Sequence, residues 1–358
     1  MKRIKLMAYA IVASLTLSMG AGAAFADGEV TNSGNLSIKK TMTVEKGTSV
    51  PAATFGFTIT AAEVADGTTI SGLPVKAGKQ LSNNVNNAQF TGEEKLKNEV
   101  ATATTSASYN FNEKQNVDYA DQKNTIQRYV VKEMATQVPG VTVDDKQFLL
   151  DVYVGNDGNV KYLVGYDTTD GKTVGNKAPI VFNNKYKSHS LTISKIVEDT
   201  TAFVDENAEF EFNVTVNTLA NSGVTKLTAK TIKDNQPVAN SSNPAEVTVG
   251  KETTFKLKNG ENFVLSGLPQ GMTYSVSETP NANYTAKVQV NTEAEQASSE
   301  VQNQAMADKD SAVKFTNTRN PITPTGVLLN VAPYLVALAV VAIGGAWFVS
   351  RRMKQRQA

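Results

Sequence analysis

The chain has 358 residues, a formal net charge of +1, a single histidine and no cysteine. The lack of cysteine excludes disulfides, cysteine metal sites and cysteine nucleophiles, and one histidine argues against a Ser-His-Asp triad or a histidine-rich metal site. The balanced charge gives no support to nucleic-acid binding. We therefore expect no metal, no other cofactor and no nucleic-acid partner.

The N-terminus has the pattern of a secretory signal. Basic residues lie among the first five positions, an apolar run follows at 7–17, and Ala24-Phe25-Ala26 before Asp27 offers an A-x-A cleavage site. An N-terminal membrane anchor is the alternative, but the apolar run is short and ends in small residues. The sequence predicts a signal peptide at 1–26, cleaved between Ala26 and Asp27, and hence an exported protein.

The middle of the chain, about 300 residues, is long enough for two domains. Gly and Pro punctuate short alternating segments, which is typical of all-β domains. The segment 91–99 is a candidate for a short helix. Strands are expected at 36–44, 55–60, 129–133, 148–154, 160–166, 180–184, 191–197, 209–216, 253–257, 274–278 and 313–317.

Three segments of the first half recur in the same order in the second half. LSIKK at 36–40 matches LTISK at 191–195, YVVKE at 129–133 matches YSVSE at 274–278, and IVFNN at 180–184 matches VKFTN at 313–317. The repeat places a boundary near 185–190 and predicts an N-terminal domain at 27–187 and a C-terminal domain at 188–320. His189 lies in this polar junction, where we expect an exposed linker residue.

Each repeated segment carries one polar side chain on its apolar face. Side chains alternate along a strand, so residues two apart share a face, and the apolar face of a sandwich strand points inward. The inward polar residues are Lys40, Glu133 and Asn184 in the first domain and Lys195, Glu278 and Asn317 in the second.

Such buried polar groups must satisfy one another or react. Burial lowers the pKa of a lysine and raises that of a glutamate. A neutral amine can then attack the asparagine carboxamide, while the carboxylic acid polarises the carbonyl and moves protons as ammonia leaves. The alternatives are a conventional buried salt bridge beside an amide, or a coincidence of pattern in edge strands.

The C-terminus has the layout of a sortase sorting signal. Ile322-Thr323-Pro324-Thr325-Gly326 precedes an apolar run at 327–349 and a basic tail at 351–356. The apolar run exceeds the roughly 20 residues of a membrane span. Positively charged flanks tend to stay in the cytoplasm, so the basic tail is expected on the cytoplasmic side of the membrane. The motif departs from Leu-Pro-x-Thr-Gly at its first two positions. We predict a sorting signal at 321–358 with cleavage between Thr325 and Gly326; a proline-rich linker before an ordinary anchor is the alternative.

Together, the end signals and the repeated motifs resemble the streptococcal FctA/T-antigen family of major pilins, the backbone subunits of Gram-positive, sortase-assembled pili. The resemblance implies two tandem Ig-like, CnaB-related β-sandwich domains. It also implies self-formed isopeptide bonds, one from Lys40 to Asn184 assisted by Glu133, and one from Lys195 to Asn317 assisted by Glu278. Pulling force would then be carried by covalent bonds between the first and last strands of each domain.

The same resemblance implies a polymer. A sortase would cleave at Thr325, and a lysine shortly before the closing asparagine of the next subunit, matched here by Lys177, would accept the acyl group. Strand parity with Asn184 places Lys177 on the outward face. The alternative is an ordinary solvated lysine, because further lysines lie nearby at 161, 172, 185 and 187.

The resemblance implies that the protein is a structural subunit and not an enzyme. Its partners would be copies of itself, a pilus-class sortase, tip or basal minor pilins and peptidoglycan, at the cell wall and pilus surface after transient membrane anchoring. One alternative is a wall-anchored adhesin or minor pilin that uses the same sandwiches as a stalk. A surface hydrolase is the other, but it would need clustered acids or a histidine base, and no such motif stands out.

Overall fold

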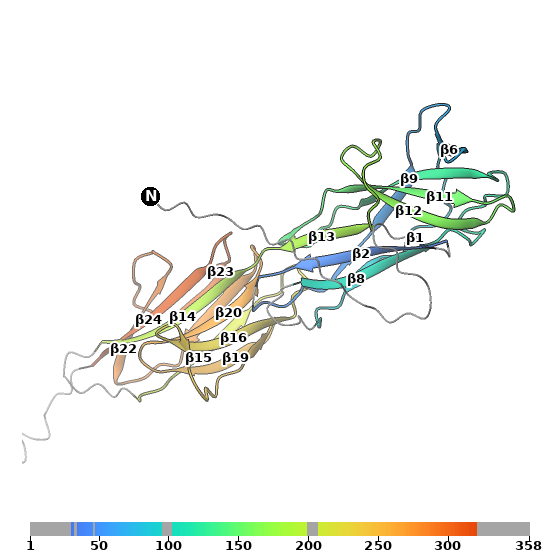
Figure 1. Ribbon diagram of the computed structural model, residues 1–358. Helices are drawn as coiled ribbons and strands as arrows, with labels where there is room; N and C mark the ends of the chain where they lie inside the picture. Colours follow the sequence, from blue (N-terminus) through green and yellow to red (C-terminus); the bar gives the residue numbers. More distant parts are fainter. Residues whose placement is uncertain (1–29, 32–33, 46, 95–101, 199–206, 321–358) are drawn as a thin grey trace, which may run out of the picture. The chain divides into compact units, whose positions relative to one another are not determined.

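The computed structural model describes residues 30–31, 34–45, 47–94, 102–198 and 207–320 (Figure 1). The predicted signal peptide, sorting motif, apolar span and basic tail lie outside these residues. Throughout the described ranges, no helix is long and apolar enough to cross a membrane. The regular structure of those ranges is β-strand, so the all-β class is confirmed.

The chain divides into two compact units. The first comprises Met1–Ser188 with Ala220–Val224, and the second comprises His189–Leu219 with Thr225–Ala358. All the strands predicted from the sequence overlap observed strands. The segment predicted at 55–60 is interrupted at Gly56, because β3 (Ala53–Phe55) pairs with β7 (Ala88–Phe90) whereas β4 (Phe57–Ala61) pairs with β9.

The first unit is a sandwich of a seven-stranded and a four-stranded sheet. The larger sheet has the order β1 (Val30–Thr31), β12 (Val160–Thr168), β11 (Gln147–Val154), β9 (Thr125–Glu133), β6 (Leu73–Ala77) and β5 (Thr69–Ile70), with β4 also on β9. The smaller sheet has the order β10 (Val141–Thr142), β13 (Val181–Tyr186), β2 (Asn35–Thr43) and β8 (Thr102–Asn110). Residues of both sheets share one apolar core.

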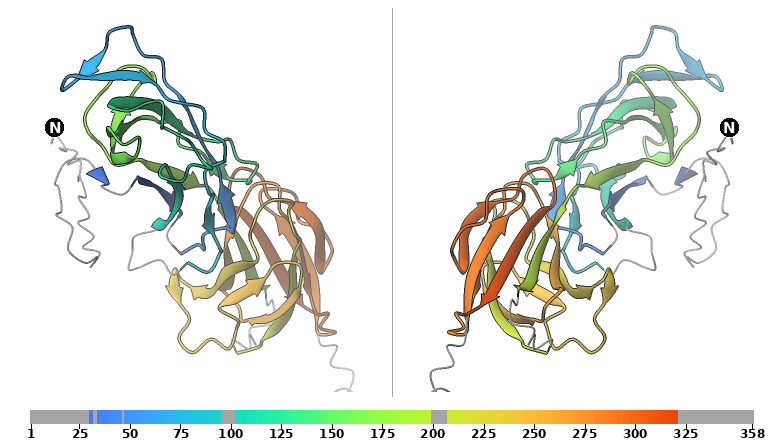
Figure 2. Two further views of the ribbon diagram at one scale, coloured as in Figure 1. Left: turned by 90° about the vertical axis from the view of Figure 1, so that its right-hand side faces the viewer. Right: turned by 90° about the vertical axis from the view of Figure 1, so that its left-hand side faces the viewer.

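Strand β9 is buried on both faces. Tyr129 and Val131 belong to the main core, whereas Ile126 and Val130 belong to a second apolar cluster with Val75 of β6. Figure 2 shows the β5–β6 hairpin (light blue) as it leaves the body of the first unit. The second cluster explains why residues 125–131 of β9 are all buried, although the strand sequence TIQRYVVKE is rich in polar residues.

The second unit repeats the two-layer plan. Its larger sheet has the order β17 (Gln236–Pro237), β16 (Lys226–Lys233), β20 (Glu261–Leu268), β14 (His189–Glu198), β24 (Ser311–Arg319) and β22 (Tyr284–Val290), with β18 (Glu246–Thr248) also on β16. The smaller sheet has the order β19 (Glu252–Leu257), β15 (Phe210–Val216), β21 (Thr273–Glu278) and β23 (Glu300–Ala305). Phe212 and Phe315 meet between the two sheets, with ring centres 5.2 Å apart.

In each unit, the opening and closing strands of the repeat are adjacent and parallel. These pairs are β2 with β13 and β14 with β24 (Figure 1). The strand that carries the glutamate, β9 or β21, belongs to the facing sheet of the same sandwich. This arrangement brings three distant parts of the sequence to one point in each core.

The junction residue His189 differs from its prediction. It is only 8% exposed, and its Nε2 atom lies 3.1 Å from Asp308 Oδ1. The expectation of an exposed linker residue was wrong, because β14 begins at His189 and the alternation of that strand turns its side chain to the same side as Leu191 and Ile193.

Candidate functional site

Strand register places the predicted lysine and asparagine of the first unit side by side. Lys40 stands opposite Phe182 across the β2–β13 pair, and Asn184 stands opposite Met42. Both side chains therefore point into the core from neighbouring strands. Glu133, the last residue of β9, reaches them from the facing sheet. Lys40, Glu133 and Asn184 are called site 1 below.

The carboxylate of Glu133 bridges the other two members of site 1. Lys40 Nζ lies 3.0 Å from Glu133 Oε2, and Asn184 Nδ2 donates to Glu133 Oε1 at 2.8 Å. The side chains of Lys40 and Glu133 and the whole of Asn184 are 0% exposed. A Lys–Glu pair in contact with an amide is thus held away from solvent.

Burial changes the acid–base character of site 1. Desolvation is the main cause that lowers the pKa of Lys40, and the hydrogen bond and charge of Glu133 oppose it only in part. Desolvation likewise raises the pKa of Glu133 against the opposing effect of Lys40. Both shifts favour a neutral amine beside a neutral carboxylic acid, which is the protonation state that nucleophilic attack requires.

The carbonyl of Asn184 has a different partner from the one predicted. We expected the carboxylic acid to polarise this carbonyl, but Glu133 lies against the amide nitrogen. Asn184 Oδ1 instead accepts the backbone N–H of Asp144 at 2.8 Å. The carboxylate of Asp144 accepts the N–H of Asn183 at 2.8 Å. Sequence reasoning missed Asp144 because a backbone donor leaves no signal in residue type.

Lys195, Glu278 and Asn317 form site 2 in the second unit. Across the β14–β24 pair, Lys195 stands opposite Phe315 and Asn317 opposite Val197, the same register as in site 1. Lys195 Nζ lies 2.8 Å and 3.0 Å from the two oxygens of Glu278, and Asn317 Nδ2 donates to Glu278 Oε1. These three residues are at most 3% exposed.

Burial favours the neutral form of Lys195. Its Nζ lies 4.2 Å from the ring centre of Phe210 and 5.9 Å from that of Phe212, and these ring contacts by themselves would favour the charged amine. Desolvation by burial is the main cause that lowers the pKa of Lys195 to about 8, while the charge of Glu278 opposes it. The amine is therefore much closer to its neutral form at physiological pH than an exposed lysine would be.

Site 2 differs from site 1 at the asparagine carbonyl. Asn317 Oδ1 is fully buried and accepts no hydrogen bond; among the described side chains, only Ser188 Oγ shares that condition. A buried carbonyl without a donor is energetically costly. The carboxamide of site 2 therefore has one hydrogen bond fewer at its oxygen than the carboxamide of site 1.

Lys177 is exposed and precedes β13. Its segment pairs with β12 through a bridge between Tyr166 and Lys177 and a hydrogen bond from the N–H of Ala178 to the carbonyl of Gly165 at 3.0 Å. Gly165 permits this approach, because a Cβ there would lie 2.5 Å from the Ala178 carbonyl oxygen. The parity count from Asn184 does not apply across the break before β13, although the lysine does face outward.

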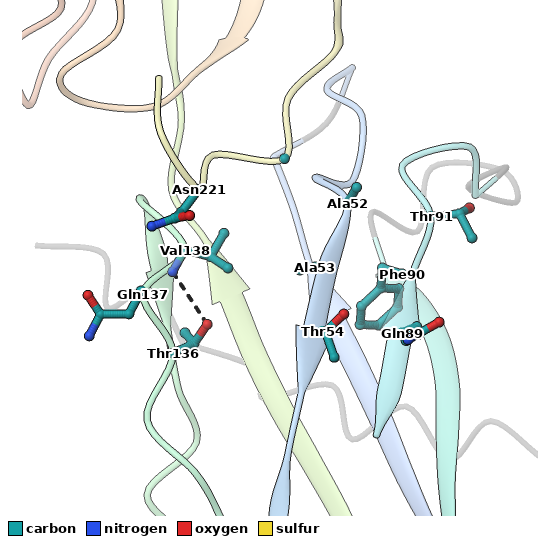
Figure 3. Close-up of a pocket in the computed structure, with 11 residues that line it drawn as sticks. Ala52, Ala53, Thr54, Gln89, Phe90, Thr91, Thr136, Gln137, Val138 and Asn221 are labelled. Atoms are coloured by element: carbon teal, nitrogen blue, oxygen red, sulfur yellow. Dashed lines mark hydrogen bonds between the residues drawn. The ribbon is translucent and has the colours of Figure 1, made fainter. Parts of the chain in front are cut away.

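A pocket of the first unit is lined by β3, β7 and the loop 136–138 (Figure 3). All its lining side chains are uncharged. Within the loop, the N–H of Val138 donates to Thr136 Oγ1 at 3.3 Å. The pocket therefore offers neither the paired acids nor the histidine base that a hydrolase would need.

Comparison with known proteins points in one direction. A family model described as a domain of unknown function (DUF7601) matches residues 189–319. A pilin of Streptococcus pyogenes serotype M1 is 33% identical over 238 residues, which cover 62% of this chain and 66% of the pilin. The pilus tip adhesin Cpa of Streptococcus pyogenes is 29% identical over 208 residues, 55% of this chain and 27% of the adhesin. The chain thus spans just under two thirds of the pilin's length and about a quarter of the adhesin's.

Solved structures agree with the sequence matches. The crystal structure of the major pilin from Streptococcus pyogenes superposes with a TM-score of 0.60 at 25% identity, covering 81% of this chain and 99% of that one. The T3.2 major pilin from Streptococcus pyogenes gives a TM-score of 0.59 at 28% identity, with the same coverage. In sequence and in fold, this chain is similar to the streptococcal major pilins of the T-antigen type.

Proposed function

We propose that the chain is the major structural subunit of a covalent surface pilus, in which each domain closes itself with a Lys–Asn isopeptide bond. The observation that carries the proposal is the pair of buried Lys–Glu–Asn sites. In each, the lysine and the asparagine lie on adjacent, parallel strands, and the glutamate reaches them from the facing sheet. The structural role is supported by the similarity to major pilins, which covers 81% of this chain and 99% of each pilin structure.

The residues of each site suffice for the reaction. The neutral amine of Lys40 attacks Cγ of Asn184, and a C–N bond forms as the carbonyl electrons move to Oδ1. Glu133 takes a proton from the attacking nitrogen and delivers one to Nδ2, so that the C–Nδ2 bond breaks and ammonia leaves. Lys195, Asn317 and Glu278 act in the same way. The balance is one amine and one carboxamide giving one secondary amide and one ammonia.

The intact mass of the purified 27–325 fragment tests the cross-links. We expect the mass to be lower than the sequence mass by two ammonia molecules. Glu133→Ala and Glu278→Ala should each retain one ammonia, because each removes the proton carrier of one site. The unmodified mass for the parent fragment would overturn the cross-link proposal.

Polymerisation would join Thr325 of one subunit to Lys177 of the next. The exposure of Lys177 supports this assignment, and so does a hollow of about 700 Å³ lined in part by Gly175, Ala178 and Pro179 of the same segment. A single head-to-tail contact repeated between identical subunits builds an open filament. The sorting signal would be removed at Thr325, so the mature subunit is secreted and held in the pilus or wall.

A ladder of covalent multimers in wall extracts tests this step. Lys177→Ala should abolish the ladder and leave monomer. Lys172→Ala is the matched control, because Lys172 is also exposed but pairs with Glu63 at 2.8 Å. Similarity to the tip adhesin Cpa favours one alternative, a stalk protein that is anchored without polymerising; monomer alone in the parent strain would favour that alternative.

A further inference from the structure

The loop that follows β10 supplies the only hydrogen bond to the Asn184 carbonyl among the described residues. β10 pairs with β13, with Val141 opposite Tyr186 and Thr142 opposite Lys185. Beyond that short ladder, the N–H of Asp144 turns to Asn184 Oδ1. An N–H group can only donate, so this contact also fixes which end of the carboxamide is oxygen and leaves Nδ2 facing Glu133.

The position of this N–H is fixed by the side chain of the same residue. The Asp144 carboxylate accepts the N–H of Asn183 at 2.8 Å and that of Lys146 at 3.2 Å. One bond ties the loop to β13 beside the reacting asparagine, and the other closes a tight turn. The donor is therefore preorganised before any charge develops.

We propose that the backbone N–H of Asp144 is the oxyanion donor of site 1, and that site 1 for this reason closes faster than site 2. This inference rests on the proposed function. When Lys40 Nζ bonds to Cγ of Asn184, negative charge collects on Oδ1, which the Asp144 N–H already contacts. A preorganised donor in a water-free site stabilises that charge strongly. Glu133, placed against Nδ2, is then the acid that releases ammonia.

Site 2 lacks this donor. Asn317 Oδ1 is buried and accepts no hydrogen bond from the described residues. Lys195 contacts both carboxylate oxygens of Glu278, whereas Lys40 contacts one oxygen of Glu133. In both sites the lysine is paired with the glutamate and the asparagine Nδ2 donates to its Oε1 atom, so the hydrogen bond to the carbonyl oxygen is the contact that site 2 lacks. Loss of one oxyanion-hole donor in enzymes slows the reaction ~10²- to 10³-fold. We therefore expect site 1 to lead site 2 by at least ~10-fold.

Refolding kinetics of the 27–325 chain test the proposal. Chain recovered unreacted from inclusion bodies is refolded by dilution and quenched in acid at intervals. Peptide mapping by mass spectrometry then follows the Lys40–Asn184 and Lys195–Asn317 peptides separately. Asp144→Pro removes the N–H without adding a donor, and should slow site 1 about 10²-fold while site 2 keeps its rate. Asp145→Pro is the control in the adjacent residue and should leave both rates unchanged.

A second variant covers the case in which Asp144→Pro does not fold. Asp144→Ala keeps the N–H but frees it from its two carboxylate contacts, so site 1 should slow by ~3- to 10-fold and site 2 should not change. Protease resistance of the first domain before bond formation reports folding. Equal rates at the two sites of the parent chain, or a site 1 rate unaffected by both substitutions, would overturn the inference. Failure of both sites to lose ammonia in the parent chain would instead overturn the proposed function.

Discussion

Sites 1 and 2 show how much of a reactive site is set by strands and how much by loops. The lysine–phenylalanine register, the parallel strand pair and the glutamate on the facing sheet are the same in both units. The asparagine carbonyl is not: Asp144 donates to it in site 1, and nothing described donates to it in site 2. The strands bring the lysine, glutamate and asparagine together, and a neighbouring loop sets the hydrogen bonding of the asparagine carbonyl.

A second comparison sets the ion pair of site 1 beside another buried ion pair of the first unit. Arg128 and Asp151 form a buried bidentate pair on the outer face of β9 and β11, with both N···O distances at 2.7 Å. The Asp151 hydrogen bond and charge help to raise the pKa of Arg128, and an arginine does not lose its proton in a protein. Site 1 holds a lysine and an adjacent amide, so burial there can produce a nucleophile.

Replacing the asparagine of each site should have the largest effect on stability, and it tests whether the two sites stabilise their domains equally. Asn184→Ala and Asn317→Ala each prevent one bond that closes a loop of more than ~100 residues, worth about 5 kcal/mol in the chain-entropy model. We expect the melting temperature of the affected domain to fall by about 10–20 °C in calorimetry. Unchanged melting temperatures, with ammonia retained, would show that the cross-links do not stabilise the domains.

Breaking the Arg128–Asp151 pair should destabilise the first domain without affecting chemistry. Asp151→Ala leaves Arg128 buried and unpaired, which costs about 3–5 kcal/mol, so the denaturation midpoint should fall while both ammonia losses persist. Asp157→Ala, which breaks the exposed pair with Lys161, is the control and should have little effect. A loss of the site 1 bond in Asp151→Ala would show that the Arg128–Asp151 pair also helps to position Glu133.

The pH dependence of bond formation distinguishes the nucleophile of site 2 from an ordinary lysine. Burial lowers the pKa of Lys195 from 10.5 to about 8, so roughly 1% of the amine is neutral at pH 6 and roughly 90% at pH 9. The rate of ammonia loss during refolding should rise about tenfold per pH unit below 8 and level off above it. A rate that keeps rising toward pH 10 would indicate an unshifted amine.

The smallest effect concerns the tyrosine that begins each glutamate motif. Tyr274 OH lies 2.7 Å from Ser311 Oγ, whereas Tyr129 OH contacts Tyr119 OH at 2.7 Å and the Lys79 carbonyl at 2.8 Å. Tyr274→Phe and Tyr129→Phe should each cost about 0.5–1.5 kcal/mol. We expect the larger cost at Tyr129, which has two partners, in chemical denaturation of the two variants. An equal or smaller cost there would show that the second partner adds nothing.

Alternation along strands was enough to predict the burial of all six residues of the two sites. It works because a one-residue shift would turn the whole apolar face of a strand to solvent. The same signal is weak in β8, where Thr, Ser and Ala dominate the sequence TATTSASYN, so that strand was not predicted. Of the short helix expected at 91–99, residues 95–99 lie outside the described ranges, and residues 91–94 have no helical assignment.

Contacts outside the repeated segments could not be predicted. Asp144 acts through its backbone, and its partner is 40 positions away. His189 is buried because a strand begins earlier than the polar sequence KSHS suggested. Arg128 and Asp151 are buried because a second apolar cluster, to which β9, β11, β12 and the β5–β6 hairpin contribute, lies on the outer face of their sheet.

The pairing of β2 with β13 and of β14 with β24 has a consequence for resistance to proteolysis. With both bonds formed, residues 40–184 and 195–317 become closed covalent rings. A protease that cuts once inside a ring opens it, but the two fragments stay joined through the isopeptide bond. Only the short stretch between Asn184 and Lys195, with the flanks beyond the rings, can be severed by one cut. Within the described part of the chain, almost every exposed loop would then be a place where a single cleavage leaves the two fragments joined.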